Sequence, residues 1–195
     1  MRAFIALPLD DDLRRRIAGS LMKWRQFDPE LKWVDPALLH VTLRFLGEID
    51  PSLLPKFEQA IRETARDVAP FVISLGRAGA FPSLARPRVF WLGLSPADRL
   101  LSLASELDRK LAQLGWGNRE ERFVSHLTVA RLRREVRPLP GFLTYWQRLA
   151  DGSEEGPAGS WKTDRLVLYE SRLHPRGPEY LPLLQVRLLD GQGRS

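Results

Sequence analysis

Two histidines and two threonines have the types and spacing best suited to chemistry. The tetrapeptide His40-Val41-Thr42-Leu43 returns as His126-Leu127-Thr128-Val129, in a chain with only three histidines and five threonines. In an extended strand, residues i and i+2 point to the same face, so each motif places an imidazole beside a hydroxyl. Two such pairs facing each other would supply a general acid, a general base and two neutral hydrogen-bond donors. This set of groups suits phosphoester chemistry without a metal.

The motifs allow two other interpretations. Either motif alone also fits a half-buried sheet position whose histidine is hydrogen-bonded to a neighbour. The repetition, with aliphatic residues at positions two and four of both copies, favours a functional pair instead. Paired histidines can also bind zinc, but the chain has no cysteine and no Asp or Glu at a ligand-like spacing beside them. We therefore expect acid–base catalysis with no metal and no cofactor.

Seven strands and four helices are expected around the motifs. Apolar runs bounded by turn residues predict strands at 2–7, 39–46, 71–75, 89–94, 127–132, 165–169 and 184–188. Helices are predicted after Asp10, from Asp50-Pro51 to before Pro70, from the capping-box-like Ser95-Pro96-Ala97-Asp98 to Gly115, and between Pro140 and Leu149.

The fold class follows from the motif repeat. No glycine-rich phosphate loop follows the first strand, which argues against a parallel doubly wound sheet. The repeat indicates a pseudo-symmetric α+β fold over residues 1–195, as one domain. Its two similar lobes would each hold an antiparallel sheet and one His-x-Thr motif, and would meet at a cleft.

Composition describes an ordinary globular chain. It has 195 residues, 44% of them hydrophobic and 28% charged, and no run of about 18 apolar residues that would predict a membrane span. The lack of cysteine is compatible with the cytoplasm, and a monomer is expected. The net charge of +6 favours anionic partners. The excess of arginine over lysine fits phosphate recognition and, equally, a GC-rich or thermophilic genome.

The chain resembles the 2H phosphoesterase superfamily, whose signature is two His-x-Thr/Ser-x motifs. Within this superfamily, the chain resembles the branch of the bacterial and archaeal RNA 2′,3′-cyclic phosphodiesterases, also known as LigT-like 2′-5′ RNA ligases. The likeness covers nearly the whole chain and is carried by residues 2–7, 32–34, 39–48, 79–82, 86–89, 126–131 and 168–173. One departure is Val124-Ser125, where the branch commonly has Arg-Pro; it would alter the entry of the strand or remove a phosphate contact.

This resemblance implies a bilobal LigT-like fold with both motifs on adjacent central strands. It implies hydrolysis of a terminal 2′,3′-cyclic phosphate on RNA to a 2′-phosphomonoester. By the same resemblance, His40 is the proton donor and His126 the proton acceptor; the residues alone do not order them. Thr42 and Thr128 would donate hydrogen bonds to the phosphate oxygens.

Two arginines near the motifs are candidate phosphate contacts. The resemblance makes Arg131 one, but its odd offset from His126 points it to the wrong face of an ideal strand, so a bulge or the strand end must redirect it. Arg44 has the same parity as His40 and faces either the cleft or a solvated sheet edge.

Further substrate contacts are expected from aromatic and basic residues. The candidates for base stacking are Phe81, Trp33 and Tyr169, and those for the RNA backbone are Lys32, Arg172 and Arg176. Trp24, Trp91 and Trp116 are assigned to packing, and His174 to an unrelated loop. The partners would be RNA ends, including tRNA fragments, or cyclic nucleotides. Two alternatives stay open: 2′-5′ RNA ligation as the main role, and an RNA- or nucleotide-binding module without turnover.

Overall fold

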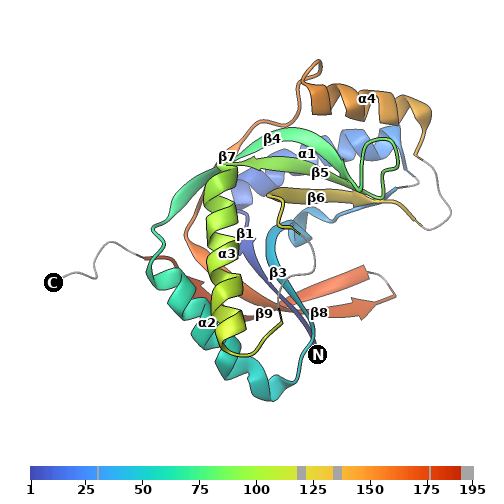
Figure 1. Ribbon diagram of the computed structural model, residues 1–195. Helices are drawn as coiled ribbons and strands as arrows, with labels where there is room; N and C mark the ends of the chain where they lie inside the picture. Colours follow the sequence, from blue (N-terminus) through green and yellow to red (C-terminus); the bar gives the residue numbers. More distant parts are fainter. Residues whose placement is uncertain (30, 118–121, 134–137, 176, 190–195) are drawn as a thin grey trace.

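Two antiparallel sheets form the centre of the molecule (Figure 1). The computed structural model describes residues 1–29, 31–117, 122–133, 138–175 and 177–189. The first sheet has the order β3-β1-β8-β9, with β1 Arg2–Pro8, β3 His40–Glu48, β8 Arg165–His174 and β9 Gly177–Arg187. The second has the order β2-β6-β5-β4-β7, with β2 Lys32–Trp33, β4 Phe71–Phe81, β5 Val89–Ser95, β6 His126–Arg131 and β7 Ser160–Thr163.

Four α-helices cover the sheets: α1 Asp11–Phe27, α2 Leu54–Arg66, α3 Ala97–Gln113 and α4 Pro140–Asp151. Helix α1 follows β1 of the first sheet but packs on the second, where Trp24 stacks on Trp33 at 6.1 Å and meets Trp146 of α4 edge-on at 5.1 Å. Helix α3 follows β5 of the second sheet but packs on α2 and β3 of the first (Figure 1). The lobes therefore exchange helices. None of the described helices is long and apolar enough to cross a bilayer.

The expected pair of α+β lobes is confirmed, but the expected central position of both motif strands was wrong for one of them. The lobes are not the two halves of the sequence, because the first sheet draws strands from both chain ends and β2 joins the second sheet. The motif strands are neighbours, but only β6 has strands on both sides, whereas β3 is the edge strand of its own sheet. The histidines therefore face each other between sheets, not within one.

All of the expected strands and helices are present, with four differences in detail. Strands β4, β8 and β9 run well beyond the predicted segments, and the short strands β2 and β7 were not predicted. Asp50 caps a 3₁₀ turn at Pro51–Leu53, ahead of α2, by accepting a hydrogen bond from the Ser52 amide at 2.9 Å. The predicted capping box is wrong: Ser95 belongs to β5, and α3 begins after Pro96 without a side-chain cap.

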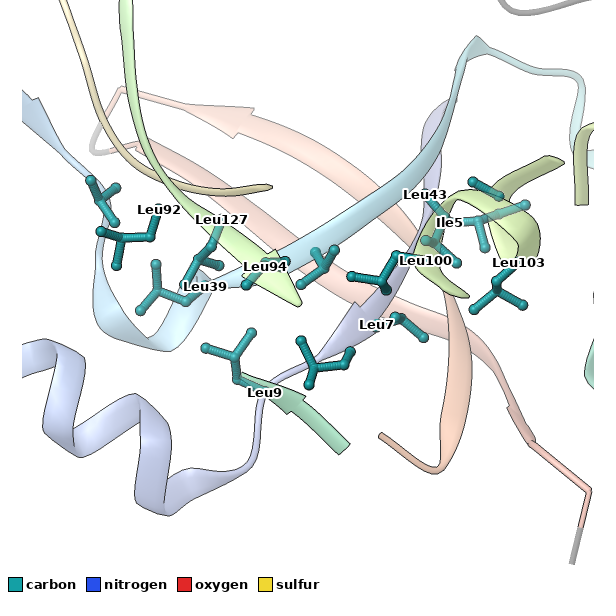
Figure 2. Close-up of a cluster of buried hydrophobic side chains, with 14 of the residues drawn as sticks. Ile5, Leu7, Leu9, Leu39, Leu43, Leu92, Leu94, Leu100, Leu103 and Leu127 are labelled. Carbon is teal, nitrogen blue, oxygen red and sulfur yellow. The ribbon is translucent and has the colours of Figure 1, made fainter. Parts of the chain in front are cut away.

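A single apolar cluster lies between the sheets and fixes the motif strands (Figure 2). Leu43 of β3 and Leu127 of β6 are fully buried in it, as are Val41 and Val129. Each such side chain contributes about 1.5–3 kcal/mol by leaving water. Because side chains alternate along a strand, burial of these aliphatic residues turns the histidine and threonine of each motif to the opposite face.

Candidate active site

The two motifs line a cavity that is divided into two adjoining pockets. The large pocket measures about 950 Å³ and the small pocket about 460 Å³. Six residues line both and so mark the boundary between them: Thr42, Phe45, Gly47, His126, Thr128 and Arg131. His40 lines the small pocket only. The structure thus brings both predicted histidine–threonine pairs to one site.

Each histidine is held by the same local hydrogen bond. The Nδ1 atom of His40 lies 2.7 Å from the carbonyl oxygen of Leu38, and that of His126 lies 2.7 Å from the carbonyl oxygen of Val124. A carbonyl oxygen only accepts, so both rings carry their proton on Nδ1 and leave Nε2 free. The departure at Val124-Ser125 does not disturb this contact, because a backbone carbonyl makes it.

Burial keeps both imidazoles neutral in the empty site. The pKa of His40 is lowered from 6.5 to about 4, mainly by burial; the hydrogen bond to the Leu38 carbonyl opposes this shift, and the nearby Arg131 charge and the proximity of His126 add to it. Burial also lowers the pKa of His126 below 6.5, and Arg131 acts in the same direction. Phe4, at 4.7 Å, and Tyr180, edge-on at 5.1 Å, enclose the His40 ring.

Arg131 reaches the cavity through the bulge that its offset required. In the register of β6 against β5, Thr128 faces Trp91 and Ala130 faces Phe90, so Val129 is the extra residue. Arg131 is consequently exposed and lines both pockets beside His126 and Thr128. The sequence predicted that a bulge or the strand end must redirect Arg131 toward the cavity, and the structure confirms a bulge.

The same bulge in β3 changes which residue follows the first motif into the cavity. Leu43 is the extra residue there, between Thr42 and Arg44. Phe45 therefore takes the place that Arg131 takes in β6, five residues after the histidine, and it is 63% exposed at the boundary of the two pockets. Phe45 was not among the predicted site residues, although it lies five residues after His40, the same offset as Arg131 from His126.

Arg44 lies in the wall of the large pocket with its charge already engaged. Its Nη1 atom donates to Asp108 at 3.1 Å and its Nη2 atom to the Gly117 carbonyl oxygen at 2.5 Å. The side chain is only 8% exposed. The solvated-edge alternative is therefore wrong. Arg44 faces the cavity as the other alternative expected, but its guanidinium is bound to protein groups.

Only one of the three aromatic candidates for stacking lines the cavity. Phe81 lines the large pocket and packs edge-on against His126 at 4.9 Å. Trp33 was a wrong choice: it is buried, and its indole nitrogen donates to the Asp28 carbonyl oxygen at 2.7 Å. Tyr169 lines neither pocket and instead stacks on Phe4 at 5.2 Å, behind His40.

Of the basic residues predicted to contact the RNA backbone, one lines a pocket and one does not. Lys32 lines the small pocket, on the face of β2 opposite to Trp33. Arg172 lines neither pocket; it is exposed and donates to Glu170 at 3.0 Å. Arg176 lies outside the described residues. His174 ends β8 and pairs with Glu179 at 3.2 Å, away from the cavity.

Several residues of the cavity wall were not predicted as substrate contacts, and Trp116, assigned to packing, both packs edge-on against Phe57 and lines the large pocket. Tyr180 and Arg2 line the small pocket, and Arg88, Arg122 and Trp116 line the large one. No local pattern marks them, because they come from β9, β1 and loops that the fold brings together. Within the described parts of the chain, no Asp or Glu lines either pocket, and no three His, Cys, Asp or Glu side chains gather as a metal site would require.

Gly79 and Trp91 form a support behind His126. They are cross-strand partners on β4 and β5, and the Trp91 ring lies 5.1 Å from Phe81 and 6.1 Å from His126. A Cβ on Gly79 would lie 2.2 Å from the Trp91 ring. We expect Gly79→Ala to lower the free energy of unfolding by about 1–3 kcal/mol in urea titrations, because the indole must move out of a packed position.

Gly19→Ala is the matched control for this prediction. Gly19 lies on the exposed face of α1, and a Cβ there meets no atom within 4 Å. This substitution should raise the free energy of unfolding by about 0.5–1 kcal/mol, since alanine loses less backbone entropy in a helix. Equal stability of the two variants would show that Trp91 tolerates the added methyl group.

The sequence matches one superfamily profile and relatives of one name over nearly its full length. The profile of the 2′-5′ RNA ligase superfamily matches residues 7–175 of the chain. The RNA 2′,3′-cyclic phosphodiesterase of Methanothermobacter thermautotrophicus is 33% identical over 96% of this chain and 99% of that protein. The protein of the same name from Archaeoglobus fulgidus is 33% identical over 94% of this chain and 98% of that protein.

Comparison with solved structures agrees over nearly the full length. The crystal structure of a Thermus thermophilus protein superposes with a TM-score of 0.76 at 29% identity and covers 96% of this chain and 98% of that one. Escherichia coli LigT, crystallised in complex with 3′-AMP, superposes with a TM-score of 0.71 at 26% identity and covers 96% of this chain and 97% of that one.

Proposed function

This chain belongs to the 2′-5′ RNA ligase superfamily, and on that basis we propose that it is a hydrolase of terminal 2′,3′-cyclic phosphates on RNA. The product is a 2′-phosphomonoester. One observation carries the proposal: two imidazoles with Nδ1 held by backbone carbonyl oxygens, each beside a threonine, converge on one cavity that no described carboxylate lines.

The reaction needs one proton removed and one delivered. Water attacks phosphorus opposite O3′, a P–O bond forms, and the P–O3′ bond breaks. His126 Nε2 takes the proton of the attacking water, and His40, as imidazolium, gives a proton to the departing O3′. Thr42 and Thr128 donate hydrogen bonds to the non-bridging oxygens, and the Arg131 guanidinium balances the charge that develops there. The small pocket, which His40 lines, then receives the nucleoside, and the nucleophile arrives from the large pocket.

Protonation of His40 depends on the substrate. A residue with a pKa of about 4 is neutral at pH 7 in the empty site. The bound phosphate brings a negative charge against the ring, and an opposite charge raises the pKa of an imidazole. The proposed donor therefore becomes competent on binding, while His126 stays ready to accept a proton.

The pH dependence of kcat/KM should reflect the lowered histidine pKa values. The alkaline limb of kcat/KM follows the pKa of the acid in the free enzyme, and burial places the pKa of both histidines below 6.5. We expect kcat/KM for uridine 2′,3′-cyclic phosphate to fall by about tenfold per pH unit above neutrality. The alkaline decrease of kcat should begin at a higher pH than that of kcat/KM, because the bound phosphate raises the pKa of His40. A kcat/KM that rises between pH 6 and 8 would contradict the proposed protonation states.

Product analysis tests the function directly. An oligonucleotide with a 2′,3′-cyclic phosphate end is incubated with the protein in excess EDTA, and the position of the phosphate in the product is determined. A 2′-phosphomonoester is the expected product. Tight binding of the oligonucleotide without any product would establish the binding-module alternative instead.

Ligation is a second candidate function, favoured by the size of the large pocket. Its volume of about 950 Å³ on the side of the nucleophile far exceeds what a water molecule needs. A 5′-hydroxyl strand could attack there in place of water and form a 2′-5′ linkage. Adding such a strand to the same incubation measures the rate of ligation, and in water we expect hydrolysis to exceed it. The same assay should compare the rates of hydrolysis of tRNA fragments with 2′,3′-cyclic phosphate ends and of small cyclic nucleotides.

A further inference from the structure

Lys32 and Arg131 are two positive charges placed directly opposite each other. They are cross-strand partners on β2 and β6, and both side chains line the small pocket. Like charges at directly opposed positions of an antiparallel pair are destabilising. Among the described residues that line the small pocket with these two side chains, none is an Asp or a Glu. The repulsion is relieved when each of the two charges meets an anionic group.

A third positive charge and two hydroxyl groups lie around the same pocket. Arg2, at the start of β1, lines it and is exposed. Ser171 of β8 and Tyr180 of β9 are cross-strand partners that supply hydroxyl groups to its wall. Phe4 and Leu173 provide apolar surface. A pocket of about 460 Å³ with these walls fits one nucleotide together with a phosphate group.

We propose that the small pocket holds the phosphate that precedes the terminal nucleotide, in addition to that nucleotide itself. The inference rests on the proposed function. Arg131, at the boundary of the pockets, contacts the reacting phosphate. Lys32, one strand further, then meets the next phosphate along the RNA, and Arg2 adds a positive charge to the same pocket. The chemical class selected is therefore a nucleotide with phosphate on both its 5′ and its 2′,3′ positions, rather than a nucleoside 2′,3′-cyclic phosphate.

Two substrates that differ only in the 5′-phosphate test this proposal. They are uridine 2′,3′-cyclic phosphate and its 5′-phosphorylated form. The wild-type protein should show a kcat/KM about 10- to 100-fold higher for the phosphorylated substrate, the factor that one hydrogen bond between charged groups supplies. In Lys32→Gln this ratio should fall to within about threefold of one. Lys23→Gln on the exposed face of α1 removes the same charge away from the pockets and should keep the wild-type ratio.

Each other outcome has a definite meaning. A wild-type ratio near one, or an unchanged ratio in Lys32→Gln, would overturn the proposal. Loss of the ratio in Lys23→Gln as well would show a general effect of net charge and would also overturn it. If Arg88→Gln, in the large pocket, abolishes the ratio while Lys32→Gln does not, the second phosphate lies on the other side. Failure of the wild-type protein to turn over either substrate would instead refute the proposed function.

Discussion

His126→Ala is expected to lower kcat for a 2′,3′-cyclic phosphate by about 10²- to 10⁴-fold, the contribution of one general acid or base. His40→Ala should cause a loss of the same order, because hydrolysis needs a proton removed from water and another delivered to O3′. The two groups act in one step, so the double variant should be little worse than the poorer single variant. Steady-state rates on uridine 2′,3′-cyclic phosphate measure all three.

His174→Ala is the matched control for the two histidine variants. His174 is exposed, pairs with Glu179 and lines neither pocket, so its loss should leave kcat unchanged within about twofold, as for a surface substitution. Full activity of either His40→Ala or His126→Ala would remove the basis of the two-histidine mechanism. Circular dichroism of each variant separates a loss of chemistry from a loss of fold.

A substrate with sulfur in place of O3′ should restore most of the activity that His40→Ala loses. A thiolate leaves without being protonated, so the general acid is no longer needed. We expect His40→Ala to recover about 10²- to 10⁴-fold relative to wild type on this substrate. His126→Ala should remain impaired, because deprotonation of the attacking water is unchanged.

The opposite pattern would reverse the assignment of acid and base. Burial lowers the pKa of His40 to about 4, which alone would favour it as the acceptor. The proposed donor role requires that the nucleoside lies in the small pocket, which His40 lines. The sulfur substrate distinguishes these two cases. Recovery of His126→Ala in place of His40→Ala would place the nucleoside in the large pocket.

The reacting groups could be predicted from the sequence because strand geometry is local. Alternation of side chains alone sets His40 beside Thr42 and His126 beside Thr128, and the aliphatic residues between them fix the buried face. Arg131 lies an odd number of residues after His126, so it could share the face of that histidine only if the strand ended or contained a bulge. The sequence does not show that β3 has the same bulge, at Leu43. Strict alternation from His40 and Thr42 therefore selected Arg44 and not Phe45.

The rest of the site depends on distant parts of the chain. Lys32 and Trp33 are adjacent and must point to opposite faces of β2, but the sequence does not say which face is the cavity. Tyr180 reaches His40 only because β9 pairs with β8 far beyond the predicted strand. Ser95-Pro96 resembles a helix cap in isolation, but pairing of β5 with β4 extends through Ser95 and removes it from that role.

The exchange of helices between the lobes determines how the cavity can be used. Separating the two sheets would pull α1 off the second sheet and α3 off the first, and would open the apolar cluster that both sheets share. The free energy required is comparable to that of unfolding the core, so the two imidazoles keep a preset spacing throughout turnover. Opening of the two sheets is therefore not a route for substrate entry or release, and we expect the contacts in the two pockets to determine how fast the product leaves.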